Sequence, residues 1–384
     1  MSKVQDISEV RKKYKKKSIV KRIILLLLIF LLVLVALSFT NETVRNRVND
    51  WISTVAAEFG GGSGFPVSLA GANPVELASM SNDLGVLTDT NFYVYNQNGK
   101  EIGNIKHGFT NPKVVVNSSM SAIYDRGGKK LVLSSKTKEI LTQTYEFSIL
   151  TADLAKNGYL AVATGSQRYT SQLTVYDNSQ KEFMHWYSAQ NHIVSLSILS
   201  DGSGIAVGTL GAENGSLKST LHLLSFSSEE PIATLDFPGE AIYAVDCKEG
   251  GNIFVLTDKA ARVVSAKGKV EGEYIYGATN LVSFSTEGSK QVVLVFGDYN
   301  QYQQATVVML NQKGEKTGEV SLQESVKGLS VSGDKVALLL QRQAVVYSMS
   351  GEQIRTVPVE RGSIGVQMAG SGVYVSMTGE IRKG

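Results

Sequence analysis

One hairpin pattern recurs along the chain from residue 65 to residue 384. Each copy has an apolar strand, a polar turn that often holds Gly, and a charged outgoing strand, with the clearest copies at residues 92–105, 173–186, 307–320 and 344–357. Short apolar runs bounded by turn residues indicate β-strands. A second hairpin precedes most copies, as at residues 195–210, 243–258, 281–296 and 328–340. Two hairpins per unit of about 40 residues are typical of the four-stranded blades of a β-propeller.

The number of blades follows from the number of innermost strands. The pattern predicts that these strands begin near Val75, Val114, Ile149, Ser195, Ile242, Leu281, Gly328 and Gly365. The last unit stops after about three strands, whereas an extra strand, Phe65–Leu69, precedes the first unit. Pairing this extra strand with the C-terminal strands would complete the last blade and cover two open sheet edges. The sequence therefore predicts an all-β, eight-bladed β-propeller over residues 65–384, with seven blades as the alternative.

The N-terminal region carries the pattern of a membrane anchor. The apolar run Ile23–Phe39 contains no charge and directly follows residues 1–22, which hold nine Lys and Arg residues and two acidic residues. As a helix these residues extend roughly 26 Å, close to the thickness of a hydrocarbon core. The basic flank predicts a cytoplasmic N-terminus. We expect a single-pass transmembrane helix in the cell membrane, with the propeller extracytoplasmic. A cleaved signal peptide is the alternative, but Ala36–Leu37–Ser38 matches a cleavage site poorly.

Residues 40–64 are expected to connect the anchor to the propeller. Apolar residues recur there at helical spacing: Val44, Val48, Trp51, Val55 and Phe59. Such a stripe predicts an amphipathic helix that lies on the membrane or against the outer domain, and a weak homodimer through residues 44–59 is the alternative. The glycine-rich segment Gly60–Gly64 then forms a short tether.

The distribution of charge argues against binding to nucleic acid. The whole chain has a formal net charge of +3, and residues 1–22 contribute +7 of it, so the remaining residues sum to −4. A mildly acidic domain without a basic stripe does not fit a nucleic-acid partner. The single cysteine, Cys247, cannot form an internal disulfide, so the domain must be stabilised by its own core.

Three stretches carry a resemblance to a known family: YDRGG at 124–128, YTSQLTVYD at 169–177 and residues 185–207. Together with the blade spacing, they resemble a family of uncharacterised membrane-anchored WD40-like or quinoprotein-like β-propellers, with a domain of unknown function, from Gram-positive bacteria. This resemblance implies the fold and the membrane location, and it supplies no activity. The more distant likeness to quinoprotein and outer-membrane assembly propellers concerns architecture only.

The chain lacks the motifs that carry enzymatic chemistry. It contains no G-x-S-x-G, G-x-G-x-x-G, C-x-x-C or H-E-x-x-H sequence. Its four histidines are scattered, and His185 and His192 lack the neighbouring carboxylate or thiolate that a metal site needs. We therefore expect no catalytic residues, no metal site and no cofactor, and we expect that the protein is not an enzyme.

Binding residues are expected on one face of the ring. In a four-stranded meander, the loops between the second and third strands share a face with the connections between blades. We call this the loop-rich face and the opposite one the short-turn face, because the long segments Gly208–Thr220 and Gly297–Thr306 are expected on the first and the tight glycine turns on the second. Loops on rigid scaffolds carry function, and Tyr, Trp and Arg are enriched at binding hot spots. The candidate binding residues are Tyr124, Asp125, Arg126, Arg168, Tyr169, Trp186, Tyr299 and Tyr302.

Five of the candidates also have an ordinary structural interpretation. Asp125 and Arg126 would pair with each other or cap a turn, and Trp186, in the expected interblade segment Trp186–His192, would pack between blades. Tyr299 and Tyr302 would be exposed aromatics on a solvated loop.

Two functional hypotheses remain. The first is an interaction module that binds a protein or a cell-wall polymer through the loop-rich face. The second is a structural or assembly scaffold that recruits membrane proteins through residues 44–59. Because the tether leads into the outermost strand of the closing blade, it is expected to attach on the short-turn face, leaving the loop-rich face directed away from the membrane.

Overall fold

The computed structural model describes residues 61–384 apart from Glu229, Tyr299 and Asn300, together with four helical residues of the N-terminal region: Arg45, Val48, Ile52 and Ala56. The chain divides into two compact units, Met1–Phe59 and Gly60–Gly384. The expected basic tail and the run Ile23–Phe39 lie outside the described residues. Within the part that is described, no helix has the length and apolar character needed to cross a membrane.

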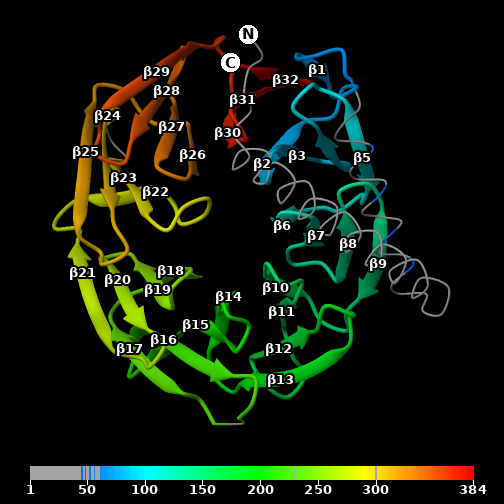
Figure 1. Ribbon diagram of the computed structural model, residues 1–384. Helices are drawn as coiled ribbons and strands as arrows, with labels where there is room; N and C mark the ends of the chain where they lie inside the picture. The colour runs from blue at the N-terminus through cyan, green and yellow to red at the C-terminus, as the bar shows by residue number, and fades with distance from the viewer. Residues whose placement is uncertain are drawn as a thin grey trace, which may run out of the picture. The chain divides into compact units, whose positions relative to one another are not determined.

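The described part of the second unit forms eight four-stranded antiparallel sheets arranged as blades around a ring (Figure 1). Blades 1 to 4 comprise β2 (Pro74–Met80), β3 (Asp83–Thr88), β4 (Asn91–Tyr95) and β5 (Glu101–Lys106); β6 (Pro112–Val116), β7 (Met120–Asp125), β8 (Lys130–Ser135) and β9 (Glu139–Thr144); β10 (Ile149–Leu154), β11 (Leu160–Thr164), β12 (Ser171–Tyr176) and β13 (Glu182–Ser188); and β14 (His192–Ile198), β15 (Gly204–Glu213), β16 (Ser216–Ser225) and β17 (Ala233–Pro238).

Blades 5 to 8 continue the same order. They comprise β18 (Ile242–Cys247), β19 (Asn252–Thr257), β20 (Ala260–Ser265) and β21 (Val270–Ile275); β22 (Asn280–Ser285), β23 (Val292–Asp298), β24 (Gln301–Leu310) and β25 (Lys316–Leu322); β26 (Gly328–Ser332), β27 (Lys335–Leu339), β28 (Gln343–Ser348) and β29 (Gln353–Pro358); and β30 (Gly365–Ala369), β31 (Gly372–Met377), β32 (Glu380–Lys383) and β1 (Val67–Ser68). In every blade the first-named strand lies innermost (Figure 1).

The first and last strands of the ring share one blade. Val67 pairs with Ile381 and Ser68 with Glu380, in the strand order β1-β32-β31-β30. This pairing confirms the eight-bladed prediction and the role of the extra strand. The strand is shorter than the expected Phe65–Leu69, and the ring of Phe65 packs against that of Tyr374, with 5.0 Å between ring centroids.

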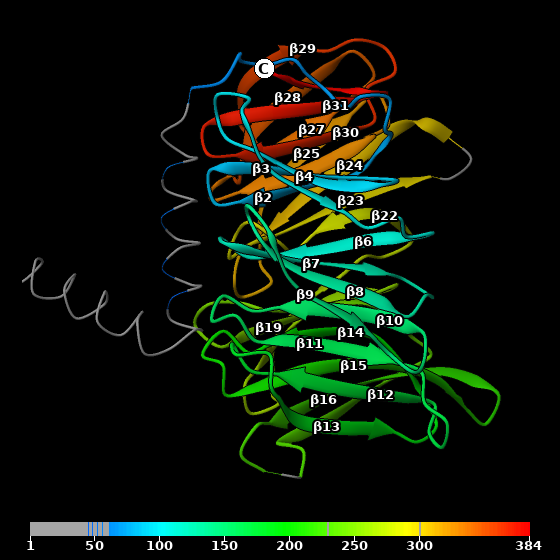
Figure 2. The same ribbon diagram turned by 90° about the vertical axis from the view of Figure 1, so that its right-hand side faces the viewer.

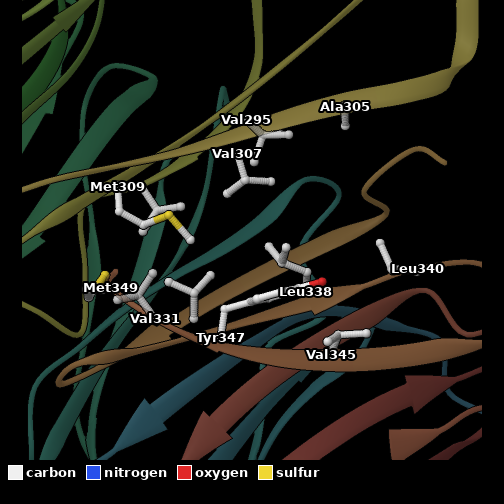
Figure 3. Close-up of a cluster of buried hydrophobic side chains, with 12 residues drawn as sticks. Val295, Ala305, Val307, Met309, Val331, Leu338, Leu340, Val345, Tyr347 and Met349 are labelled. Carbon is white, nitrogen blue, oxygen red and sulfur yellow. The ribbon is translucent and has the colours of Figure 1, made fainter. Parts of the chain in front are cut away.

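The core is divided among the interfaces between blades. Eight buried apolar clusters occur among the described residues, one between each pair of neighbouring blades, including blades 8 and 1. Figure 3 shows the cluster between blades 6 and 7, where Val307 and Met309 of β24 face Leu338 of β27 and Tyr347 of β28. Each blade is thus buried on both faces, as its apolar second strands require. The ring depends on every interface, since each blade covers its two neighbours.

The two faces of the ring differ less than the sequence predicted. The connections Phe226–Ile232 and Thr286–Gln291 are long although they lie on the short-turn face, and Gly215 and Gly379 form tight positive-φ turns on the loop-rich face. The expected segregation of long loops and glycine turns is therefore wrong in these places. The chain does enter the propeller on the short-turn face, because the Gly64 N–H donates to the Asn98 carbonyl oxygen in the turn after β4 (2.9 Å).

Candidate binding face and central channel

Two long β-hairpins extend from the loop-rich face. In blade 4, β15 and β16 pair without interruption from Gly204 and Ser225 to Glu213 and Ser216. In blade 6, β23 and β24 form the second long hairpin. Figure 2 shows both at its right-hand side, the first in green and the second in gold. The sequence predicted loops over Gly208–Thr220 and Gly297–Thr306, but most of these residues continue the strands because each finds a partner across the hairpin.

A network of charges supports the first hairpin. The Lys218 ammonium lies 3.1 Å from a carboxylate oxygen of Glu213 and 2.9 Å from one of Asp236 on the neighbouring strand β17. The hydrogen bond to Asp236 and the contact with Glu213 raise the pKa of Lys218, and the same contact with Lys218 lowers the pKa of Asp236. The Thr220 hydroxyl also donates to Asp236 (2.8 Å). These contacts stabilise the outer part of the hairpin, where Leu217 remains 42% exposed.

An exposed pair of tyrosines lies on the loop-rich side of blade 3. Tyr169, in the loop after β11, is 41% exposed, and its ring centroid lies 4.8 Å from that of Tyr187 at the end of β13. The Thr170 N–H donates to the Ser188 carbonyl oxygen (3.0 Å), which holds the loop against that strand. Arg168, which directly precedes Tyr169 in the chain, is also exposed. We call Arg168, Tyr169 and Tyr187 the aromatic patch.

Sequence reasoning missed Tyr187, although a signal for it exists. Along β13 the exposed residues Phe183, His185 and Tyr187 alternate with the half-buried Met184 and Trp186. Because successive residues of a strand point to opposite faces, this alternation places Tyr187 on the solvent side.

The loop after β7 ties blade 2 to blade 3. A carboxylate oxygen of Asp125 accepts the Asn111 N–H (2.8 Å), and the Arg126 N–H donates to the Asn111 carbonyl oxygen (2.9 Å). The Gly127 N–H reaches the Ile149 carbonyl oxygen at the start of β10 (2.8 Å). Asp125 thus caps the loop, and the ion pairs found among the described residues do not include one between Asp125 and Arg126. The Arg126 side chain is exposed.

The remaining candidates divide between the core and the undescribed part of the chain. Tyr124 is buried in β7, and this burial raises the pKa of its phenol. Trp186 belongs to β13, so the expected interblade segment starting at this residue is wrong. Its half-buried ring packs 5.0 Å from that of His222, between blades 3 and 4. Tyr299 lies outside the described residues, and Tyr302 belongs to β24 with a side chain that is not described.

The innermost strands enclose a central channel with a cavity of about 1610 Å³. Its lining runs from the first residues of these strands, such as Val75, to turns of the short-turn face, such as Lys248 and Glu249. The inner strands have one sheet edge open to this channel (Figure 1). Backbone N–H groups on such an edge need partners from outside their own sheet.

Side chains of one blade supply these partners to the next blade. The Ser195 hydroxyl oxygen accepts the Val245 N–H (2.9 Å), and the Ser330 hydroxyl oxygen accepts the Met368 N–H (2.9 Å). A carboxylate oxygen of Asp153 does the same for the Ile198 N–H (2.8 Å). Asp153 therefore has a structural role that serine performs in other blades.

Several carboxylates of the channel have an unusual electrostatic environment. Burial raises the pKa of Asp153 to about 6, with a further contribution from Asp246. Glu287, in the turn after β22, reaches the solvent of the channel, yet the surrounding walls withdraw it from bulk water and raise its pKa to about 7. Asp246 is neutralised by Lys248, whose ammonium lies 2.7 Å away. No group of three or more potential ligands among the described residues is arranged to hold a metal ion.

A closed ring of four-stranded blades around a central channel defines the protein as a β-propeller. Residues 70–380 match a family described as "Family of unknown function (DUF5711)", and the chain belongs to this family. The comparison with curated proteins finds no match.

Solved propellers share this architecture at low sequence identity. The C-terminal WD40 domain of Sif2 is 12% identical with a TM-score of 0.61, and the alignment covers 84% of this chain and 99% of that one. BamB from Moraxella catarrhalis is 12% identical with a TM-score of 0.55, covering 83% and 98%. The propeller domain of Cps50 (Swd1) from Myceliophteria thermophila is 10% identical with a TM-score of 0.52, covering 83% and 99%. These likenesses concern the fold alone.

Proposed function

We propose that the protein is a membrane-anchored, extracytoplasmic interaction module of the cell envelope, which binds a protein or a cell-wall polymer through the loop-rich face. The observation that carries the proposal is the aromatic patch. Tyr169 and Tyr187 form an exposed ring pair, and the exposed Arg168 precedes Tyr169 on a loop held by backbone hydrogen bonds. Exposed tyrosine and arginine side chains are the residue types that dominate binding energies at interfaces, and a rigid scaffold reduces the entropy lost on binding.

The rest of the loop-rich face supports this proposal. Arg126 presents an exposed guanidinium from the neighbouring blade, on a loop fixed by Asp125 and Asn111. The hairpin of blade 4 carries the exposed Leu217 above the ion pairs of Lys218. A large partner could contact all of these elements at once.

The membrane location rests on the sequence. The uncharged run Ile23–Phe39 behind a strongly basic tail is the pattern of a single-pass anchor with a cytoplasmic N-terminus. The resemblance to membrane-anchored propellers of Gram-positive bacteria agrees with this topology.

The test measures partner capture by the full-length chain. Wild type and the double variant Arg126→Ala/Tyr169→Ala are incubated with detergent-solubilised envelope proteins and, separately, with purified cell-wall polymer. We expect the double variant to retain much less of one of these two partners, at an unchanged melting temperature. The matched control is Ile354→Ala/Arg355→Ala on the outer strand β29, where both residues are also exposed. Equal capture by all three proteins would refute the proposal.

A scaffold acting through residues 44–59 gives a different result. Deleting these residues would abolish association with other membrane proteins, whereas changes in the aromatic patch would not.

A further inference from the structure

We propose that the central channel receives a basic peptide segment of the partner, in which Lys or Arg side chains alternate with apolar ones, and that the segment enters from the loop-rich face. This inference rests on the proposed function, because it assigns a chemistry to part of the bound partner. It places the contact in the channel, which is separate from the aromatic patch.

The inner strands are irregular at the loop-rich end of the channel. Five of them contain a β-bulge at the same position, and each bulged residue is apolar: Val75, Leu150, Val194, Tyr243 and Val282. A bulge leaves its extra residue unpaired and changes the direction of its side chain. Because the same bulge places an apolar residue near the start of five inner strands, the channel entrance has an apolar character.

Three apolar residues that line the cavity are strongly exposed at this entrance. Val75 and Tyr243 are each 48% exposed, and Ile364, directly before β30, is 49% exposed. Since the inner strands begin on the loop-rich face, these residues lie at that mouth. We call Val75, Tyr243 and Ile364 the apolar rim. Exposed apolar side chains around an opening are typical of a surface that another molecule covers.

Beyond the apolar rim the channel is acidic. Its charged lining residues carry a net charge of −3, from Glu76, Asp153, Asp246, Glu249, Glu287, Glu315 and Asp334 against Lys156, Lys248, Lys290 and Lys313. Most of the lysines are already engaged. Lys248 pairs with Asp246, and both Lys156 and Lys290 pair with Glu249.

Four of the channel carboxylates have no ion-pair partner among the described residues: Asp153, Glu287, Glu315 and Asp334. Burial raises the pKa of two of them, Asp153 and Glu287, in the wall of an enclosed channel. A carboxylate withdrawn from bulk water is unfavourable unless a positive charge compensates it. A bound ammonium or guanidinium would supply that charge, and apolar neighbours on the same segment would cover the apolar rim. Charge complementarity and the rim thus favour a basic peptide with alternating apolar residues.

The experiment measures peptide binding to the purified full-length chain by fluorescence anisotropy. The probe is a fluorescein-labelled peptide of alternating Leu and Lys, compared with alternating Ser and Lys and with alternating Leu and Glu. We expect the Leu–Lys peptide to bind, the Ser–Lys peptide to bind more weakly and the Leu–Glu peptide not to bind.

The variants separate the channel from the outer surface. Asp153→Ser/Glu287→Gln should weaken binding of the Leu–Lys peptide by about tenfold, because two favourable charge interactions are lost. Asp153→Ser keeps a hydroxyl acceptor like that of Ser195 and Ser330, so the melting temperature should be maintained. The matched control, Glu139→Gln on the outer strand β9, removes one exposed negative charge and should leave binding unchanged.

Two results would overturn the channel site. The first is the absence of binding by the Leu–Lys peptide, or unchanged binding to Asp153→Ser/Glu287→Gln. The second is loss of peptide binding in Arg126→Ala/Tyr169→Ala with no change in the channel variant. The second result would place the peptide on the outer face and leave the proposed function intact, whereas failure of partner capture would affect the proposed function itself.

Discussion

The Lys136 ammonium lies 2.7 Å from a carboxylate oxygen of Asp83, and both side chains are almost fully buried, at 5% and 3% exposure. Asp83 begins β3 in blade 1, and Lys136 follows β8 in blade 2, so this ion pair joins two neighbouring blades. Both charges have lost their water, and each depends on the other for compensation.

The first prediction concerns this pair. Asp83→Ala should lower the free energy of unfolding by about 3–5 kcal/mol, because it removes the carboxylate that compensates the buried Lys136 ammonium. Replacing both residues, as Asp83→Leu/Lys136→Met, should cost much less, since no charge remains buried. Denaturant unfolding measures both effects. The exposed pair Lys316–Glu319 is the control, and Lys316→Ala should leave the stability almost unchanged, because solvent screens an exposed ion pair. A double variant as unstable as Asp83→Ala would contradict this account.

The second prediction concerns closure of the ring. Deleting residues 65–70 removes the strand that pairs with β32 and also removes the buried Val67 and Leu69. We expect a loss of several kcal/mol in the free energy of unfolding, or aggregation through the exposed edge. Deleting residues 41–59 should leave the thermal stability of the propeller unchanged. As a milder test, Leu69→Ala should cost about 2–5 kcal/mol. Equal melting temperatures for the two deletions would show that the strand does not close the ring.

The third prediction concerns the pH dependence of stability. The folded-state pKa of Asp153 is raised to about 6, so between pH 4 and pH 6 the folded chain binds more protons at this site than the unfolded chain. Its contribution to stability is therefore fully present below the unfolded pKa and is lost as pH rises through the folded pKa. The pKa shift corresponds to a loss of at most about 3 kcal/mol in the free energy of unfolding. The loss should be smaller than this bound, because Asp153 still contacts channel solvent.

Melting temperatures at two pH values test this effect. The melting temperature of Asp153→Ser minus that of wild type should be larger at pH 7.5 than at pH 4. The same difference at both pH values would show that Asp153 does not titrate between them.

The fourth prediction concerns topology. Because basic residues flank only the N-terminal side of Ile23–Phe39, protease added to intact protoplasts should digest the propeller and spare residues 1–22. A cytoplasmic marker protein that stays intact shows that the protoplasts are sealed. Protection of the C-terminal domain under these conditions would reverse the proposed orientation.

The sequence was a good guide to the blades because their strand pairing is local. A hairpin such as β4–β5 is determined by its own turn, and the incomplete last unit required a partner such as Val67. The binding surface was less predictable. Tyr187 is exposed because the adjoining blade leaves that side of β13 open, and the bulge at Tyr243 depends on the register between β18 and β19. The pairing between neighbouring strands cannot be found in a single strand. Trp186 was misplaced for the same reason, since its strand extends further than its turn residues suggested.

The central claim is that the loop-rich face binds the partner. The most direct test introduces a photo-crosslinking amino acid at Arg168 or Glu213 on the loop-rich face, and at Lys267 in a turn of the short-turn face, all of which are exposed. After irradiation of intact cells, crosslinked adducts of the full-length chain are counted by electrophoresis and mass spectrometry. We predict specific adducts from positions 168 and 213 and none from position 267. Adducts from position 267 alone, or equally from all three positions, would contradict a binding site on the loop-rich face.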